Sequence, residues 1–443
     1  MSPEAPSPDL DRVPGSIGDS KTKRAELKQA GITHAYLGQG LVFEPSLSAV
    51  PGFEEYLRSR DEDPGEFRLH PLMPTGDTSN IYNSPRLDRV WQDIVKGQYN
   101  GAGQRKPAGF EQFVRAQSRD TMEKLFGLPE TEIESMQVDN LQQGLLGMQM
   151  LVAELHGRPA TGVILPEQFR YPGYDKDFVT WENKRTNGPG LKIVSIPEVQ
   201  MDGTQDLKAL RQVLEQARED GELLMLIDQE HNNNSSGFDR SIDYNEELSS
   251  ILKEFSDVVF YVGDTAYKGM KLDILDPYPL QQQLLNDGVT AGHYFSPTKI
   301  GNYRGTPTHM SILTLTPGEL ANTERIRGAM AAIKRAMGIG ATEDGAITMN
   351  ALAHDAEFQG EVRTLNLYLA FVRDRLHGAL QGSGIEDYFG PQTNGIFRCL
   401  PPEIIAALNS GDRQAVTVGP RINMWPLGDE ELNRIFLDIV NGT

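Results

Sequence analysis

The sequence contains almost no cysteine, and this limits the kinds of protein it can be. Cys399 is the one cysteine among 443 residues, so an internal disulfide framework is excluded. The eight histidines show no metal-like spacing with this thiol, and we predict no metal site. Free cysteines usually pack as small apolar side chains, so we expect a packed thiol here.

Long apolar runs are also missing. No stretch approaches the roughly 20 residues that a transmembrane helix needs, so we predict no membrane association. The first thirty residues hold Pro3, Pro6, Pro8 and Pro14 among serines and charged residues, without the apolar core of a secretory signal. We therefore predict a flexible N-terminal arm over residues 1–30 and a cytoplasmic location.

Positive charge is scarce relative to negative charge. The chain has 42 Lys and Arg against 62 Asp and Glu, a formal net charge of −20. Proteins that bind the phosphate backbone of nucleic acids cluster Lys and Arg. The balance therefore opposes a nucleic-acid partner, and it indicates no particular substrate.

Strand-like and helix-like runs alternate through the middle of the chain. Short β-branched and aromatic runs lie at 133–138, 161–165, 191–196, 223–227, 258–262, 291–295 and 310–314. Apolar residues at helical spacing lie at 85–96, 110–125, 145–152, 207–217, 245–255, 319–337 and 359–380. The alternation predicts an α/β fold with a mostly parallel sheet. Short strand-like runs at 395–397 and 415–418 predict a smaller α+β domain.

The stretch from residue 258 to 304 carries the strongest chemical signal. A buried strand is expected to deliver Asp264 to the edge of the sheet, and a second strand runs into Ser296 and Lys299. Ligands of open α/β sheets bind outside the carboxyl ends of the strands. The acid and the amine are therefore expected at one edge, where they could hold a cofactor.

These residues resemble the pyridoxal-phosphate (PLP) enzymes of aminotransferase class I/II. The family has an Asp-x-Ala-Tyr element, matched by Asp264 and Tyr267, then Ser-x-x-Lys, matched by Ser296 and Lys299. The similarity extends over most of the chain, from about residue 37 to 427. It implies fold type I, with a large domain (80–365) built on a mostly parallel seven-stranded sheet and a smaller α+β domain (31–79 and 366–443).

The resemblance assigns the chemical roles around the cofactor, pyridoxal 5'-phosphate. Lys299 is implied as the amine that forms the Schiff base, and Asp264 as the partner of the ring nitrogen. Tyr267 and Asn234 are implied as donors to O3′ of the cofactor. Asn233 is a possible register for the second donor, because the segment around it departs from the family's usual His-Asn-Pro-Thr-Gly.

The same resemblance implies a phosphate site. Gln142 and Gln143 fall where the family grips the phosphate, at a strand-turn-helix junction whose free N–H groups suit an anion; a polar helix start without a ligand is the alternative. Ser296 adds its hydroxyl. Arg304 could replace the family's usual phosphate-binding arginine from another register, and Tyr99 could reach the phosphate of a partner subunit in a homodimer.

Aromatic and substrate-binding positions complete the expected site. Tyr171, with Phe169 as the second choice, is implied as the ring that stacks on the pyridine. Arg421 lies where the family presents a guanidinium to the substrate α-carboxylate, which its planar fork can bind through two hydrogen bonds. Gly38 belongs to the segment that the family lays over the substrate.

Three functions remain possible from the sequence. The first is an aminotransferase acting on a small-molecule amino acid through an external aldimine and a quinonoid. The second is a PLP lyase or synthase that performs elimination, β- or γ-replacement or carbon–carbon bond formation, on a substrate such as S-adenosylmethionine. The third, an effector-binding domain of a transcription regulator, is disfavoured because no helix-turn-helix pattern or basic patch precedes residue 37.

Overall fold

The fold described here is that of a computed structural model of the whole chain. The structure describes residues 10–14, 17–37, 51–62, 86, 89, 123–124, 127, 134–138, 140–167, 170–171, 173–186, 190–197, 204–229, 240–267, 279–296, 311–316, 323–338, 353–391, 393, 395–418 and 421–442. These residues divide between two compact units, one formed by 83–234 and 238–363 and the other by 1–82, 235–237 and 364–443.

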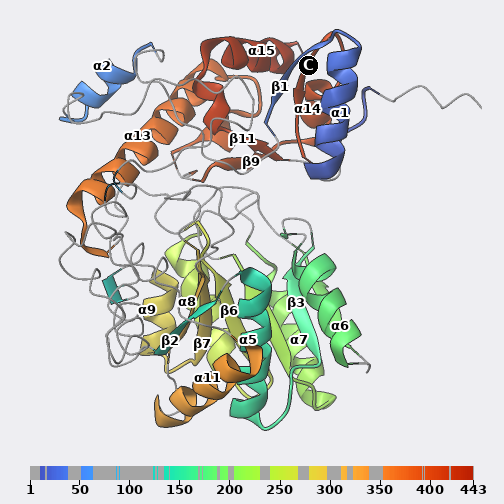
Figure 1. Cartoon of the computed structure of the whole chain (residues 1–443), viewed down its shortest axis with the longest axis vertical. Helices are drawn as coiled ribbons and strands as arrows, with labels where there is room; N and C mark the ends of the chain where they lie inside the picture. Colours follow the sequence, from blue (N-terminus) through green and yellow to red (C-terminus); the bar gives the residue numbers. More distant parts are fainter. Residues whose placement is uncertain are drawn as a thin grey trace, which may run out of the picture. The chain divides into compact units, whose positions relative to one another are not determined.

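A seven-stranded sheet forms the centre of the first unit (Figure 1). In spatial order its strands are β2 (Glu134–Val138), β8 (Ser311–Thr316), β7 (Ala291–Phe295), β6 (Val259–Asp264), β5 (Leu224–Asp228), β3 (Gly162–Pro166) and β4 (Lys192–Ile196). All neighbouring pairs are parallel except those made by β8. The predicted mostly parallel seven-stranded sheet is confirmed.

Helices cover both faces of this sheet. Those of the first unit are α5 (Leu141–His156), the π-helical turn η3 (Tyr174–Val179), α6 (Thr180–Thr186), α7 (Leu207–Glu219), α8 (Ile242–Glu254), α9 (Pro279–Asn286) and α11 (Thr323–Met337). Along β5, Met225 and Ile227 pack against the layer of α5, η3 and α11. Leu224 and Leu226 pack against the layer of α7, α8 and α9. Since successive side chains of a strand point to opposite faces, an apolar run with no alternation is buried on both.

The second unit combines helices with two small sheets. Its elements are α1 (Ile17–Gln29), β1 (Thr33–Tyr36), α2 (Phe53–Arg58), the greater part of α13 (Ala356–Ala379), η4 (Glu386–Phe389), β9 (Phe397–Cys399), α14 (Pro402–Leu408), β10 (Arg413–Val416), β11 (Arg421–Asn423), η5 (Trp425–Gly428) and α15 (Glu430–Asn441). β1 pairs in parallel with β10, and β11 pairs antiparallel with β9. Cys399, at the end of β9, is a buried free thiol.

Helix α1 differs from the predicted N-terminal arm. The predicted arm covered residues 1–30, whereas residues 17–29 form a helix whose Leu27 is fully buried against Val416 of β10. The ammonium of Lys23 is also buried, and it donates to the carbonyl oxygen of Asn409 at 2.7 Å. The other apolar residues of α1 are Ile17 and Ala25, which do not form a stripe with Leu27, so the sequence does not indicate a packed helix.

None of the helices among the residues that the structure describes is both long enough and apolar enough to cross a membrane.

Candidate functional site

The candidate site lies where β5, β6 and β7 end. Asp264 is the last residue of β6 and pairs in register with Tyr294 of the neighbouring parallel strand β7. Ser296 follows β7 directly. Both side chains are buried, Asp264 with 8% and Ser296 with 4% of its surface exposed. The predicted acid and hydroxyl thus lie at the carboxyl ends of adjacent strands.

Two bonds from one residue hold these strand ends together. Thr265, which follows Asp264, donates both its backbone N–H and its hydroxyl to the carbonyl oxygen of Tyr294, each at 2.8 Å. Thr265 is fully buried, so water does not compete for these bonds. The backbone that carries Asp264 is therefore fixed against the strand that leads to Ser296.

The carboxylate of Asp264 is oriented at both of its oxygens. Oδ1 accepts the backbone N–H of Ala266 at 3.0 Å. Oδ2 accepts the hydroxyl of Tyr174 at 2.5 Å, and that hydroxyl accepts Nε2 of Gln229 at 3.2 Å. Hydrogen bonds donated to a carboxylate favour its charged form. Neither Tyr174 nor Gln229 was predicted from the sequence. Tyr174 lies three residues after Tyr171, and Gln229 follows β5 directly; these positions were the only indications of a role at the strand ends.

The start of helix α5 forms another part of this region. Its N-cap is Asn140, whose side-chain oxygen accepts the backbone N–H of Gln143 at 2.9 Å. The first N–H groups of a helix have no acceptor within the helix, and together with the helix dipole they favour an anion. Gln142 and Gln143 lie in this first turn, and their contact with a phosphate remains a prediction.

A glycine brings this helix close to the sheet. Gly144 lies so near β7 that a Cβ atom there would come within 3.1 Å of the Tyr294 ring. A larger residue would push the helix start away from the ends of the strands. The close approach therefore sets the distance between the anion-favouring helix start and the Asp264 edge of the sheet.

The ring of Tyr171 packs beside Tyr174. The two ring centroids are 5.6 Å apart and the planes cross at 80°, an edge-to-face arrangement. The ring also folds over its own chain, because a Cβ atom at Gly173 would come within 2.3 Å of it. Tyr171 is only partly buried, so its ring belongs to the rim of the site. Stacking on a cofactor ring remains a prediction.

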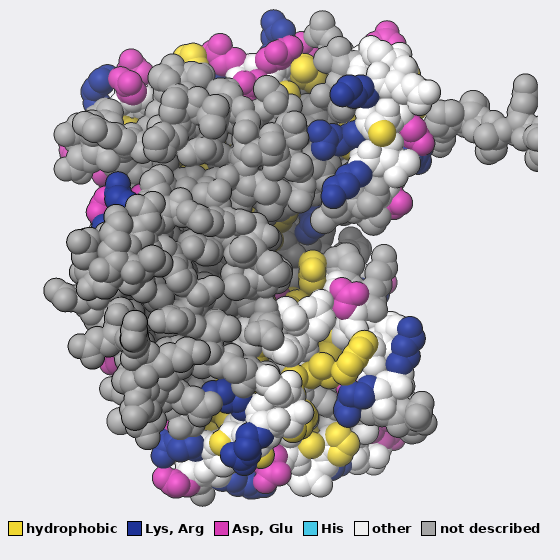
Figure 2. All heavy atoms as spheres, viewed as in Figure 1, with side chains coloured by type: hydrophobic (Ala, Val, Ile, Leu, Met, Phe, Trp, Pro, Cys, Tyr) yellow, Lys and Arg dark blue, Asp and Glu magenta, His cyan; other side chains and the backbone are white. Residues whose placement is uncertain are grey.

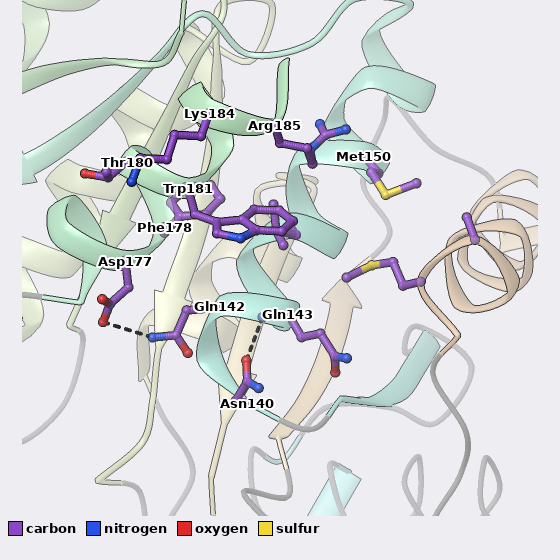
Figure 3. Close-up of a pocket in the computed structure, with 13 residues that line it drawn as sticks. Asn140, Gln142, Gln143, Met150, Asp177, Phe178, Thr180, Trp181, Lys184 and Arg185 are labelled. Carbon is purple, nitrogen blue, oxygen red and sulfur yellow. Dashed lines mark hydrogen bonds between the residues drawn. The ribbon is translucent and has the colours of Figure 1, made fainter. Parts of the chain in front are cut away.

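A cavity of about 770 Å³ opens beside the start of α5 (Figure 3). Its walls come from α5, η3, α6 and the end of α11, and they include Phe178, Met150 and the half-exposed Trp181. Gln142 lies in this wall, where its Nε2 donates to Asp177 at 3.3 Å. Figure 2 shows hydrophobic side chains gathered on this face of the sheet-containing unit, with Lys and Arg beside them. Asn140, Gln142 and Gln143 line the cavity, whereas Asp264 and Ser296 do not. The cavity therefore shares the start of α5 with the candidate site but does not include the ends of β6 and β7.

A second acid at the sheet edge has a cation as its partner. Asp228, the last residue of β5, forms an ion pair with Arg240 through both carboxylate oxygens, at 2.5 and 2.7 Å. Both side chains are 2% exposed. Burial alone would lower the pKa of Arg240, but the charge of Asp228 outweighs it and raises the pKa above its usual value.

The remaining predicted residues divide into two groups. Tyr267 is buried three residues beyond Asp264. Arg421 opens β11 in the other unit, where its guanidinium lies 4.5 Å from the ring centroid of Phe397. The predicted residues Lys299, Asn234, Asn233, Arg304, Tyr99, Gly38 and Phe169 lie outside the described residues.

The described residues at the strand ends and at the start of α5 supply the chemical groups that a pyridoxal phosphate needs. The site offers a buried, doubly oriented carboxylate, an anion-favouring helix start and a hydroxyl at the end of the next strand. A cationic ring nitrogen suits the first, and a phosphate suits the other two.

Comparison with solved structures identifies the architecture. An aromatic-amino-acid aminotransferase from Burkholderia pseudomallei, covalently bound to pyridoxal phosphate, is similar over 88% of this chain and 95% of its own, with 15% identity and a TM-score of 0.65. An aspartate aminotransferase from Trypanosoma cruzi is similar over 82% of this chain and 90% of its own, with 13% identity and a TM-score of 0.63. The broad specificity aminotransferase from Leishmania mexicana is similar over 88% of this chain and 95% of its own, with 14% identity and a TM-score of 0.63. No protein-family model matches the sequence, and no curated protein is similar to it. The chain has the fold of these aminotransferases, which is the fold type I architecture predicted from its motifs.

Proposed function

We propose that this chain is a pyridoxal-phosphate-dependent enzyme that transfers the amino group of an amino acid. The observation that carries the proposal is the buried carboxylate of Asp264, held at the end of β6 beside Ser296 in the fold of the aminotransferases. The cofactor, when bound, supplies a ring that withdraws electrons from the α-carbon of the substrate. The sheet-containing unit, close to the predicted span 80–365, is the proposed cofactor-binding domain.

Three described groups would hold the cofactor in this proposal. Asp264 would accept the ring N–H and keep that nitrogen protonated, since a buried carboxylate stabilises a cation beside it. The N–H groups at the start of α5, with Gln142 and Gln143, would receive the phosphate together with the hydroxyl of Ser296. Tyr171 would cover the face of the ring.

Four other residues complete the cofactor site by resemblance. Lys299 would supply the amine that bonds to the cofactor and would later move a proton at the α-carbon. Asn234 and Tyr267 would donate to the cofactor's phenolic oxygen. Arg304 would neutralise the phosphate.

Substrate and assembly complete the proposal. Arg421 would bind the substrate α-carboxylate, and Gly38 would let the backbone approach the substrate closely. The solved structures named above are aminotransferases, which favours transamination over elimination or replacement. A cytoplasmic homodimer, in which Tyr99 of one subunit reaches the phosphate site of the other, remains part of the proposal.

The test combines cofactor trapping with an amine-transfer assay. Purified protein incubated with pyridoxal phosphate should acquire visible absorption, and borohydride reduction should fix the cofactor on Lys299, identified by peptide mass. Lys299→Ala should lose the label, whereas a matched Lys208→Ala on α7 should keep it. A panel of aromatic and acidic amino acids with a keto acid acceptor should give one keto acid for each amino acid formed.

The outcomes separate the functions. A label on a different lysine, or no bound cofactor, would refute the proposal. Release of a leaving group without amine transfer would instead establish the lyase or synthase alternative.

A further inference from the structure

The side chain of Tyr174 lies inside the protein although it begins a short turn. It is fully buried, in the cluster where the layer of α5 and η3 packs against β3, β5 and β6. A phenol hydroxyl in such a place usually bonds a specific partner, because an unpaired buried hydroxyl is costly. Its partners therefore indicate what the residue is there to do.

One hydroxyl joins three elements of the site. Tyr174 on η3 donates to Oδ2 of Asp264 at the end of β6, at 2.5 Å, and it accepts Nε2 of Gln229, which follows β5, at 3.2 Å. Gln229 is itself 4% exposed. Because the amide of Gln229 donates to the phenol oxygen, the phenol's own proton points to Asp264. Gln229 thus donates to Tyr174, and Tyr174 donates to Asp264.

The phenol stays neutral in this position. Burial raises the pKa of Tyr174 well above 10.0, and the charge of Asp264 raises it further. The hydroxyl is therefore a permanent donor at physiological pH. A neutral donor favours the carboxylate form of Asp264 and fixes its orientation without cancelling its charge.

We propose that Tyr174 is a positioning residue for Asp264: its hydroxyl holds the carboxylate in the orientation that meets the ring nitrogen of pyridoxal phosphate. The inference rests on the proposed function, since it assigns a ring nitrogen as the partner of Asp264. Tyr174 acts through the carboxylate and does not itself touch the substrate.

A purely structural role for the hydroxyl makes a different prediction. Loss of packing around η3 would disturb the whole cofactor site, including the phosphate-binding helix start. Loss of orientation at Asp264 would disturb only the bond to the ring nitrogen. A cofactor analogue that lacks this nitrogen distinguishes the two cases.

The experiment compares equilibrium dissociation constants for two ligands, measured by visible absorbance and by quenching of tryptophan fluorescence. The ligands are pyridoxal phosphate and its deaza analogue, in which a C–H group replaces the ring nitrogen. Tyr174→Phe should weaken binding of pyridoxal phosphate about tenfold, the effect of losing a hydrogen bond to a charged group. Its affinity for the deaza analogue should stay within about twofold of the wild-type value.

A matched control removes a comparable bond elsewhere. Tyr261→Phe deletes a buried hydroxyl that donates to Asp228 at 3.0 Å, and it should not discriminate between the two ligands. If Tyr174→Phe does not fold, Gln229→Met should show the same selective loss to a smaller extent, because it frees the hydroxyl to turn.

The outcomes distinguish this inference from the function on which it rests. Equal weakening for both ligands, or no weakening, in a protein that binds pyridoxal phosphate would overturn the role of Tyr174 alone. A wild-type protein that binds neither ligand would overturn the proposed function and this inference with it.

Discussion

The buried ion pair between Asp228 and Arg240 gives a prediction whose size can be worked from the structure. Arg240 contacts both oxygens of Asp228, and both side chains are 2% exposed. The hydroxyl of Tyr261 also donates to Asp228 at 3.0 Å, and Nε2 of Gln205 donates at 3.5 Å. The pair joins the two ends of the segment 229–239, which carries Asn234, so it couples stability to the proposed site.

The perturbation is Arg240→Met. Removing one partner of a buried pair leaves an uncompensated charge and usually costs about 3–5 kcal/mol. Tyr261 and Gln205 still donate to Asp228 in the variant, so we expect the lower end of that range, about 3 kcal/mol. The double variant Asp228→Asn with Arg240→Met removes both charges and should lie within about 1 kcal/mol of the wild type.

Hydrogen exchange measured on peptides that cover β5 and β6 is the assay, because it reports the opening free energy of these strands. A loss of about 3 kcal/mol corresponds to about 100-fold faster exchange. The matched control is Arg211→Met, which breaks the exposed pair with Glu254 at 2.6 Å, with side chains 39% and 48% exposed, and should cost at most about 1 kcal/mol. A cost of Arg240→Met no larger than that of this control, or a double variant no more stable than the single one, would show that the buried charge of Asp228 does not depend on Arg240.

Three further changes have defined outcomes. Gly162→Ala should destabilise the protein by about 1–3 kcal/mol in urea unfolding, because a Cβ atom there would come within 2.7 Å of the Lys192 side chain and 3.1 Å of its carbonyl oxygen. Gly328→Ala, in open space on α11, should instead stabilise the protein by about 0.5–1 kcal/mol. Similar effects of the two changes would show that packing at Gly162 does not limit stability. Burial, with two nearby arginines, lowers the pKa of His156 below the unfolded value of about 6.5. The contribution of the neutral imidazole to the free energy of unfolding should therefore be complete above about pH 6.5 and should fall as the pH drops below it. Unfolding midpoints of His156→Gln, measured across this pH range, should lack that fall. Asn140→Ala and Asp206→Ala should each remove a helix N-cap and cost about 1 kcal/mol of stability. Only Asn140→Ala should weaken cofactor binding in an absorbance titration. An equal effect of both variants on binding would argue against a phosphate at the start of α5.

The sheet could be predicted from the sequence because each strand carries its own local signal. The observed strands of the large sheet begin and end within two residues of the predicted runs. The signal is strongest in β3, β5 and β6, which are buried along their whole length and are rich in apolar residues. Helices at the periphery were harder. No prediction covered η3 and α6, where charged residues interrupt the apolar ones. None covered α15 either, although Asp429 caps it and Phe436 and Val440 are buried at helical spacing.

The site could be predicted only in part, for a different physical reason. The positions of Asp264 and Ser296 could be predicted, because a residue at the end of a strand lies at the edge of the sheet; their roles at a cofactor remain predictions. Tyr174 and Gln229 were not found, because their roles depend on a tertiary contact across 90 residues. A side chain's partner depends on how the layers pack, and the packing of η3 on the sheet leaves no local pattern.

The two acids at this sheet edge show how such packing assigns different roles to the same chemical group. Asp228 faces a guanidinium, whose positive charge offsets its own, so this carboxylate serves to hold the backbone at the end of β5. Asp264 faces the phenol of Tyr174 and the N–H of Ala266. Both of these donors are neutral, so they orient the carboxylate of Asp264 without offsetting its charge. Exchanging the two environments, with a cation beside Asp264, would therefore weaken the binding of a cationic ring even if every distance in the site stayed the same.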